Sequence, residues 1–301
     1  MSLLLILFLL FVSTFVGTGF LVFIIGPNMV LKPKKHDDDY FEQKNVPLVP
    51  SDLGMNYAEL KIKVDKNIFL HGWFIPSNKR AKGFIIYLHG VGSSKIVGLP
   101  FVKLMHDKNF NVLMYDSRAH GKSGGKYCTY GFYERHDVTK AIESVESILK
   151  KKINKVAVYG MSMGGAIALQ AATIEKRIKV LAIEGCFTNL RTITVDYQHR
   201  LTRLPWHYLR NIAMKRSEQI ARFSHHDVSP LKAVKKIMVP VFFAHGKLDE
   251  FSKPQYSQTL FNAANTKKEI HIIENAGHHN LRRIGGKNYA DKVEKFFLKN
   301  L

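Results

Sequence analysis

The chain has 301 residues, and 45 Lys and Arg against 24 Asp and Glu give it a formal net charge of +21. Its 46% hydrophobic and 11% aromatic content excludes a disordered chain, and its length predicts one or two globular domains. Two cysteines, Cys128 and Cys186, are too few for a disulfide-stapled secreted domain, so both are expected to be free thiols. The positive charge is typical of proteins that bind nucleic acid or an anionic membrane, and also of lysine-rich surfaces with no binding role.

The first expected element is a membrane-spanning helix. Leu3 to Ile25 is an uncharged apolar run, and about 20 apolar residues cross the hydrocarbon core of a bilayer. Nothing basic precedes the run and no clear cleavage site ends it, so we expect an uncleaved anchor over residues 1–26 and a linker over residues 27–56. Basic residues early in the linker predict a single-pass membrane protein with the rest of the chain on the cytoplasmic side. They are Lys32, Lys34 and Lys35.

The body of the chain alternates strand-like and helix-like segments. Residues 57–64 and 68–75 have the pattern of an antiparallel hairpin. Later apolar runs alternate with helix-length segments, which indicates βαβ units and a mostly parallel sheet covered on both faces. These runs are Phe84–Leu88, Val112–Tyr115, Lys155–Tyr159, Val180–Ile183, Val241–Ala244 and Ile270–Ile273. Residues 191–229 lack strand signals and predict a helical lid, so the core comprises residues 57–190 and 230–301.

The most informative motif contains a candidate nucleophile. An apolar strand ends in Gly160-Met161-Ser162-Met163-Gly164, and a helix rich in small residues follows. A serine on such a sharp turn is strained and presented to substrate, and the two glycines leave room where strand and helix pass closely. The helix begins beside the serine, so its N–H groups and the positive end of its dipole face any oxyanion formed there. The pattern predicts nucleophilic catalysis by Ser162, with the N–H of Met163 in an oxyanion hole.

A second glycine-rich element, Leu88-His89-Gly90-Val91-Gly92-Ser93-Ser94, follows an apolar strand upstream of the serine. Such a loop supplies the second oxyanion donor of this kind of site, so the N–H of Val91 is predicted to lie there. The element lacks both the P-loop lysine spacing and the G-x-G-x-x-G pattern, which argues against a phosphate cradle. His89 is expected to be a hydrogen-bonded structural histidine.

In their order along the chain, these motifs resemble those of the alpha/beta-hydrolase serine hydrolases, in particular membrane-tethered esterases, lysophospholipase-like and aminopeptidase-like proteins. The resemblance covers residues 57–301 and includes the run Tyr115–Gly124 and a late Asp followed by a late His. It implies an α/β fold of the alpha/beta-hydrolase type, with a mostly parallel sheet, an N-terminal antiparallel hairpin and a helical lid insertion. It also implies that the polar residues of Tyr115–Gly124 support the active site without reacting. They are Asp116, Arg118 and His120.

The acid and base of a Ser-His-Asp triad follow by residue type and by position in that family. Asp249 ends the short loop after a late strand, and His278 follows Ala-Gly after the last strand. A serine needs a base to take its proton, and the base needs a carboxylate to orient it. The chain order Ser162, Asp249, His278 is that of the alpha/beta-hydrolases. His279 as the base and Glu184 as the acid are the alternatives.

These residues predict a serine hydrolase that cleaves carboxylic esters through an acyl-enzyme. A small-molecule acyl ester is the expected substrate, and an anchored site favours lipid-like esters. A thioesterase or a serine aminopeptidase on the same fold is the first alternative. A non-catalytic membrane-tethered binding protein is the second. The sequence assigns neither substrate-binding residues nor an oligomeric state.

No cofactor, metal or nucleic-acid partner is expected. The dense ligand types in His225-His226-Asp227, and in His36 with residues 37–39, lack the spaced pairs that a zinc site requires. No nucleic-acid motif is apparent. The surplus charge is partly carried by residues 192–226, whose basic side chains accompany Trp206 and Tyr208. This composition suits the surface of an anionic bilayer, and equally solvated lid helices packed on the core.

Overall fold

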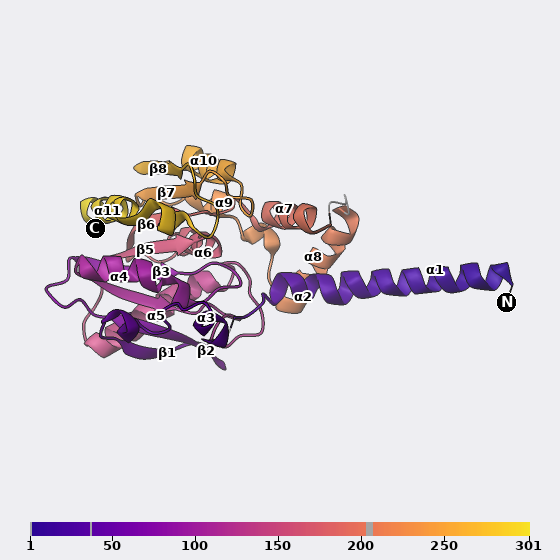
Figure 1. Cartoon of the computed structure of the whole chain (residues 1–301), viewed down its shortest axis with the longest axis horizontal. Helices are drawn as coiled ribbons and strands as arrows, with labels where there is room; N and C mark the ends of the chain where they lie inside the picture. Colours follow the sequence, from indigo (N-terminus) through magenta and orange to yellow (C-terminus); the bar gives the residue numbers. More distant parts are fainter. Residues whose placement is uncertain (1, 37, 203–206) are drawn as a thin grey trace.

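A sheet of eight strands lies between two layers of helices in the computed structural model, which describes residues 2–36, 38–202 and 207–301 (Figure 1). The strand order is β1-β2-β4-β3-β5-β6-β7-β8. Strand β2 is antiparallel to β1 and β4, and all other neighbouring strands are parallel. The strands are β1 (Ala58–Asp65), β2 (Ile68–Ile75), β3 (Gly83–Leu88), β4 (Phe110–Tyr115), β5 (Val156–Met161), β6 (Ile178–Glu184), β7 (Val241–Gly246) and β8 (Lys268–Ile273). The expected fold class is confirmed.

Helices cover both faces of the sheet because successive side chains of the buried strands point to opposite sides. In β3, Ile85 and Tyr87 pack toward α4 and α11, whereas Ile86 and Leu88 pack toward α5 and α6. The helices of the core are α4 (Leu99–Asp107), α5 (Glu134–Leu149), α6 (Met163–Ala171), α9 (Pro230–Val234), α10 (Pro254–Ala263) and α11 (Leu281–Asn300). Strands apolar on both sides are what a parallel sheet between two helical layers requires.

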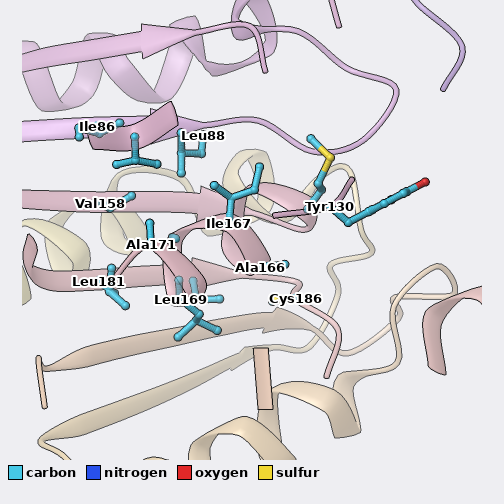
Figure 2. Close-up of a cluster of buried hydrophobic side chains, with 14 of the residues drawn as sticks. Ile86, Leu88, Tyr130, Val158, Ala166, Ile167, Leu169, Ala171, Leu181 and Cys186 are labelled. Carbon is cyan, nitrogen blue, oxygen red and sulfur yellow. The ribbon is translucent and has the colours of Figure 1, made fainter. Parts of the chain in front are cut away.

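Helix α6 is the centre of one core layer and carries the residues that follow Ser162. Figure 2 shows Ile167 and Leu169 of α6 among side chains from β3, β5 and β6, including Val158 and Leu181. Every residue of α6 is buried. Close packing on three strands fixes the position of the N-terminus of this helix at the carboxyl edge of the sheet.

The N-terminal helix projects from the body of the protein (Figure 1). It comprises α1 (Leu3–Phe20), a π-helical turn (Leu21–Ile25) and α2 (Gly26–Leu31), a continuous helix of 29 residues. No residue of α1 is buried, and the helix is long and apolar enough to be a membrane anchor or a signal sequence. Its last residue belongs to the core: Leu31 is 1% exposed, and its carbonyl accepts the N–H of Cys128 at 2.8 Å.

The segment expected to form a lid is helical where it is described. It contains α7 (Leu190–Thr202), α8 (His207–Ala221) and a short 3-10 turn (His225–Asp227). Trp206 and the neighbouring Arg203 lie outside the described residues. Helix α8 packs against α2 and the π-helical turn, so this segment connects the N-terminal helix to the core.

Candidate active site

Ser162 occupies a strained turn between β5 and α6. Its φ of 52° and ψ of −114° lie in a region that residues with a side chain rarely adopt. The flanking glycines are sterically required, because a Cβ on Gly160 would lie 2.4 Å from the carbonyl oxygen of Gly164, and one on Gly164 would lie 2.2 Å from that of Leu88. The N–H of Ser162 donates to the carbonyl of Glu184 at 2.7 Å, which ties the turn to the end of β6.

The loop after β3 lies beside the serine. A Cβ on Gly90 would be 3.5 Å from the Cβ of Ser162. His89 Nε2 accepts the N–H of Ser117 at 2.9 Å, so Nδ1 carries the proton and donates to the carbonyl of Gly90 at 2.8 Å. In a planar trans peptide the C=O and the N–H point in opposite directions. The N–H of Val91 is therefore directed away from His89.

His120 holds the same loop one residue further on. Its Nε2 accepts the N–H of Gly92 at 3.1 Å, and its Nδ1 donates to the carbonyl of Arg118 at 2.7 Å. Burial lowers the pKa of His120 to about 3, so the ring stays neutral and keeps its acceptor. The run Tyr115–Gly124 thus supports the loop through side chains that accept the loop's main-chain N–H groups.

Met163 begins α6, and the first N–H groups of a helix have no intrahelical partner. The helix dipole adds positive potential at this end. Cys128 Sγ lies 3.4 Å from Met163 Sδ, which connects this residue to the end of the N-terminal helix at Leu31. Burial raises the pKa of the Cys128 thiol well above its ordinary value, so this cysteine is a packing residue.

On the other side of Ser162, Asp249 and His278 form a hydrogen-bonded pair. His278 Nδ1 lies 2.6 Å from Asp249 Oδ2, and Asp249 Oδ1 accepts the N–H groups of Phe251 and Ser252, each at 2.8 Å. Burial alone would raise the pKa of Asp249, but the hydrogen bonds from His245 and His278 outweigh it and hold that pKa well below its usual range. Asp249 is therefore an ionised acceptor at neutral pH.

The imidazole of His278 lies beside Gly185, at the end of β6. A Cβ on Gly185 would lie 3.3 Å from His278 Cε1, and Gly185 follows Glu184, whose carbonyl holds the N–H of Ser162. The structure therefore brings the loops of Ser162, Asp249 and His278 together at the carboxyl edge of β5, β7 and β8. This edge is where parallel α/β sheets carry their ligands and reacting groups.

The alternative acid and base have other surroundings. The carboxylate of Glu184 accepts the hydroxyl of Tyr159 and lies 3.6 Å from the guanidinium of Arg282, on the α11 side of the sheet. His279 is exposed and contacts the ring of Phe251 edge-on, with centroids 4.9 Å apart. Of the two adjacent histidines, His278 is the one hydrogen-bonded to Asp249.

His245 is a residue of the site that was not predicted from the sequence. This fully buried side chain places Nε2 3.0 Å from Asp249 Oδ2 and 2.7 Å from the carbonyl of Ser252, while Nδ1 lies 2.7 Å from Ser257 Oγ. Two acceptors at Nε2 mean that the proton is there, so His245 donates to the acid and accepts from Ser257. Its position, four residues before Asp249 at the end of β7, is the signal that could have indicated it.

Among the residues that the structure describes, no group of three or more His, Cys, Asp and Glu side chains lies close enough together to hold a metal ion. His225, one of the candidates, instead lies 2.7 Å from Glu218 through Nδ1. The chemistry available at the site is that of its serine, histidine and carboxylate.

The sheet order and the turn at Ser162 define an enzyme of the alpha/beta-hydrolase superfamily, in the serine hydrolase class. The model of the acetyl xylan esterase family matches residues 128–300, more than half of the chain. The protein therefore belongs to this family.

Relatives and solved structures agree with this assignment. The chain is 29% identical to the protein YqkD of Bacillus subtilis over an alignment that covers 97% of each protein, and 24% identical to the protein bem46 of Schizosaccharomyces pombe, covering 86% of this chain and 82% of that one. The Pyrococcus furiosus esterase Pf2001 is 25% identical, with a TM-score of 0.69 over 85% of this chain and 99% of that one. An acylaminoacyl peptidase of Pyrococcus horikoshii shares the fold, with a TM-score of 0.61 over 88% of this chain and 43% of its own, at 17% identity.

Proposed function

We propose that the protein is a membrane-anchored serine esterase that cleaves carboxylic esters with Ser162, His278 and Asp249. The observation that carries the proposal is the strained turn of Ser162 beside the 2.6 Å hydrogen bond between His278 and Asp249. The esterase family and the esterase from Pyrococcus furiosus favour an ester over a thioester or a peptide as substrate. The peptidase neighbour shares only the fold.

In the proposed mechanism, Ser162 Oγ attacks the ester carbonyl while His278 Nε2 takes its proton. Asp249 holds Nδ1–H, fixes the tautomer and stabilises the imidazolium that forms. The oxyanion of the tetrahedral intermediate accepts hydrogen bonds from the N–H groups of Val91 and Met163, which are oriented before substrate binds. His278 then gives its proton to the departing alcohol, leaving an acyl group on Ser162. Water, activated by the same histidine, attacks this acyl-enzyme, and collapse of the second intermediate releases the carboxylic acid.

The anchor is the second part of the proposal. A cleaved leader would leave the chain during maturation, yet Val22 inside the apolar run is buried in the folded body, as are Pro27 and Leu31 just after it. This packing favours an uncleaved anchor over a signal sequence. Lys32, Lys34 and Lys35 favour a cytoplasmic catalytic domain. We expect the protein to resist extraction from membranes by carbonate. We also expect protease to cleave the catalytic domain only in inside-out vesicles. Release by carbonate would reject the anchor.

A fluorophosphonate probe tests the nucleophile directly. We expect the purified full chain to be labelled, Ser162→Ala to be unlabelled, and hydrolysis of a short p-nitrophenyl ester to fall at least about 1,000-fold in that variant. Ser147→Ala, an exposed serine on α5, is the matched control and should behave as the parent protein. Equal labelling of the parent and Ser162→Ala would contradict the proposal. A graded series of p-nitrophenyl esters, a thioester and an aminoacyl anilide then separates the three substrate classes.

A further inference from the structure

Helix α8 is fastened to the end of the N-terminal helix. A Cβ on Gly26 would lie 2.8 Å from Ala213 Cβ, so the two helices approach with only the methyl group of Ala213 between them. Val22 of the N-terminal helix and Met214 of α8 are both buried, 6% and 5% exposed. This close packing fixes α8 relative to the helix that the proposed function places in a bilayer.

The length of the N-terminal helix sets the depth of α8. Residues 3–20, none of which is buried, rise about 27 Å at about 1.5 Å per residue, close to the hydrocarbon core of about 30 Å. The π-helical turn and α2 then lie at the level of the lipid head groups, and α8 packs against both. Figure 1 shows α7 and α8 at the side of the body from which α1 projects.

The side chains that α8 exposes at this level suit a negative surface. Tyr208 is 77% exposed, and Lys215 and Arg216 are exposed on the same helix. The acids of the two helices are partly buried and already engaged: Asp196 lies 2.7 Å from the ammonium of Lys253, and Glu218 lies 2.7 Å from His225 and 3.5 Å from the ammonium of Lys215, which stays exposed. Exposed cations beside an amphipathic aromatic ring are the chemistry that binds anionic head groups.

We infer that the α7–α8 pair is a docking surface for an anionic phospholipid bilayer, in addition to the anchor itself. The inference rests on the proposed anchor and not on the proposed triad. The proposed docking surface contacts the loop after β7, which contains Asp249. The guanidinium of Arg200 on α7 lies 4.0 Å from the centroid of the Phe251 ring in this loop. The same ring stacks on His278, with centroids 5.6 Å apart. These contacts connect the proposed docking surface to the loop that carries Asp249.

The test uses the full chain in nanodiscs of phosphatidylcholine, with and without phosphatidylglycerol. Tyr208→Cys is labelled with an environment-sensitive NBD fluorophore, since the native thiols of Cys128 and Cys186 are buried. Met238→Cys, 75% exposed in the turn before β7, is the matched control. We expect a head-group spin-labelled lipid to quench the probe at position 208 at least about threefold more than at 238, only in discs with phosphatidylglycerol, and less as salt rises. Equal quenching at both positions in anionic discs would overturn the inference.

Two double variants test whether the basic residues of α8 cause the lipid binding. Lys215→Gln combined with Arg216→Gln should remove at least about half of the excess quenching at position 208, whereas Lys235→Gln combined with Lys236→Gln, exposed lysines after α9, should leave it unchanged. Equal losses in both double variants would reject the surface assigned here. A response of the probe to an oligonucleotide in neutral discs, without one to phosphatidylglycerol, would assign the surface to nucleic acid instead. Carbonate release reports failure of the anchor, and absent fluorophosphonate labelling reports failure of the triad, so each failure is distinguishable.

Discussion

On the β3 side of Ser162, the rings of His89 and His120 accept hydrogen bonds from main-chain N–H groups, whereas on the β7 side the rings of His245 and His278 donate to a carboxylate. The first pair must stay neutral to keep its acceptors, and burial lowers the pKa of both rings. The second pair works because Asp249 stays charged. A fall in pH or a side-chain substitution should therefore affect the two sides differently. On the β3 side it should change the geometry of the loop after β3, and on the β7 side it should change the proposed proton transfer from Ser162 to His278.

The largest expected effect is on the β7 side. Asp249→Asn keeps the size of the side chain but removes the charge that stabilises the imidazolium of His278, so we expect kcat to fall about 10³- to 10⁴-fold with little change in KM. Steady-state hydrolysis of a p-nitrophenyl ester measures this. Near-parental kcat in a folded Asp249→Asn protein would show that the acid lies elsewhere, and Glu184→Gln is the variant to compare.

His245 gives a smaller effect that separates positioning from packing. His245→Asn loses the donor to Asp249, so we expect kcat to fall about 10-fold and the loss of activity that follows protonation of Asp249 to begin at higher pH, because one hydrogen bond that lowers the pKa of Asp249 is gone. His245→Gln reaches the Nε2 position with an N–H donor and should recover most of the loss. Identical pH profiles for both variants and the parent would mean that His245 only fills space.

On the β3 side, the expected effect appears in stability. His120 has a pKa of about 3 in the folded protein against an ordinary value of 6.5, so between these pH values the unfolded chain binds more protons. The free energy of unfolding should therefore decrease as pH falls from about 6.5 toward 3. His120→Asn should flatten this slope and cost about 1–3 kcal/mol at pH 8. Urea unfolding from pH 4 to 8 measures both, and an unchanged slope would contradict the assignment.

Ser117 offers the smallest change on the same side. Its N–H donates to His89, but its buried hydroxyl has no hydrogen-bond partner among the described residues. Ser117→Ala removes only this hydroxyl, so we expect the free energy of unfolding to shift by less than about 0.5 kcal/mol and ester turnover to persist. A loss above about 2 kcal/mol would show that the Ser117 hydroxyl, and not only its N–H, stabilises this side.

The sheet and the motif order were predictable because they depend on local signals. Apolar runs ending in polar or glycine residues predicted the strands. The pattern Gly160–Gly164 predicted the turn at Ser162, where both glycines are required because a Cβ would clash with main-chain oxygens. The environment of Glu184 was not predictable, since its partners Tyr159 and Arg282 come from β5 and α11. The triad and oxyanion residues remain predictions that the proposed variants test.

Contacts between distant segments were the main gap. The donation from His245 to Asp249 is the exception, because the two residues are only four positions apart and their spacing could have indicated the contact. The packing of Gly26 against Ala213 joins residues almost two hundred positions apart, and neither helix shows a strong apolar stripe that would have predicted it. The same holds for the burial of Leu31.

Leu31 also has a consequence for biogenesis. Because its side chain is part of the core and its carbonyl binds Cys128, the domain reaches its final packing only with the end of the N-terminal helix in place. The helix leaves the ribosome before the domain does, so an anchor of the proposed kind inserts into the membrane before the core closes around Leu31. Under this proposal the enzyme finishes folding at the bilayer surface, and removing residues from the N-terminal end of the helix should impair assembly less than deleting its last turn.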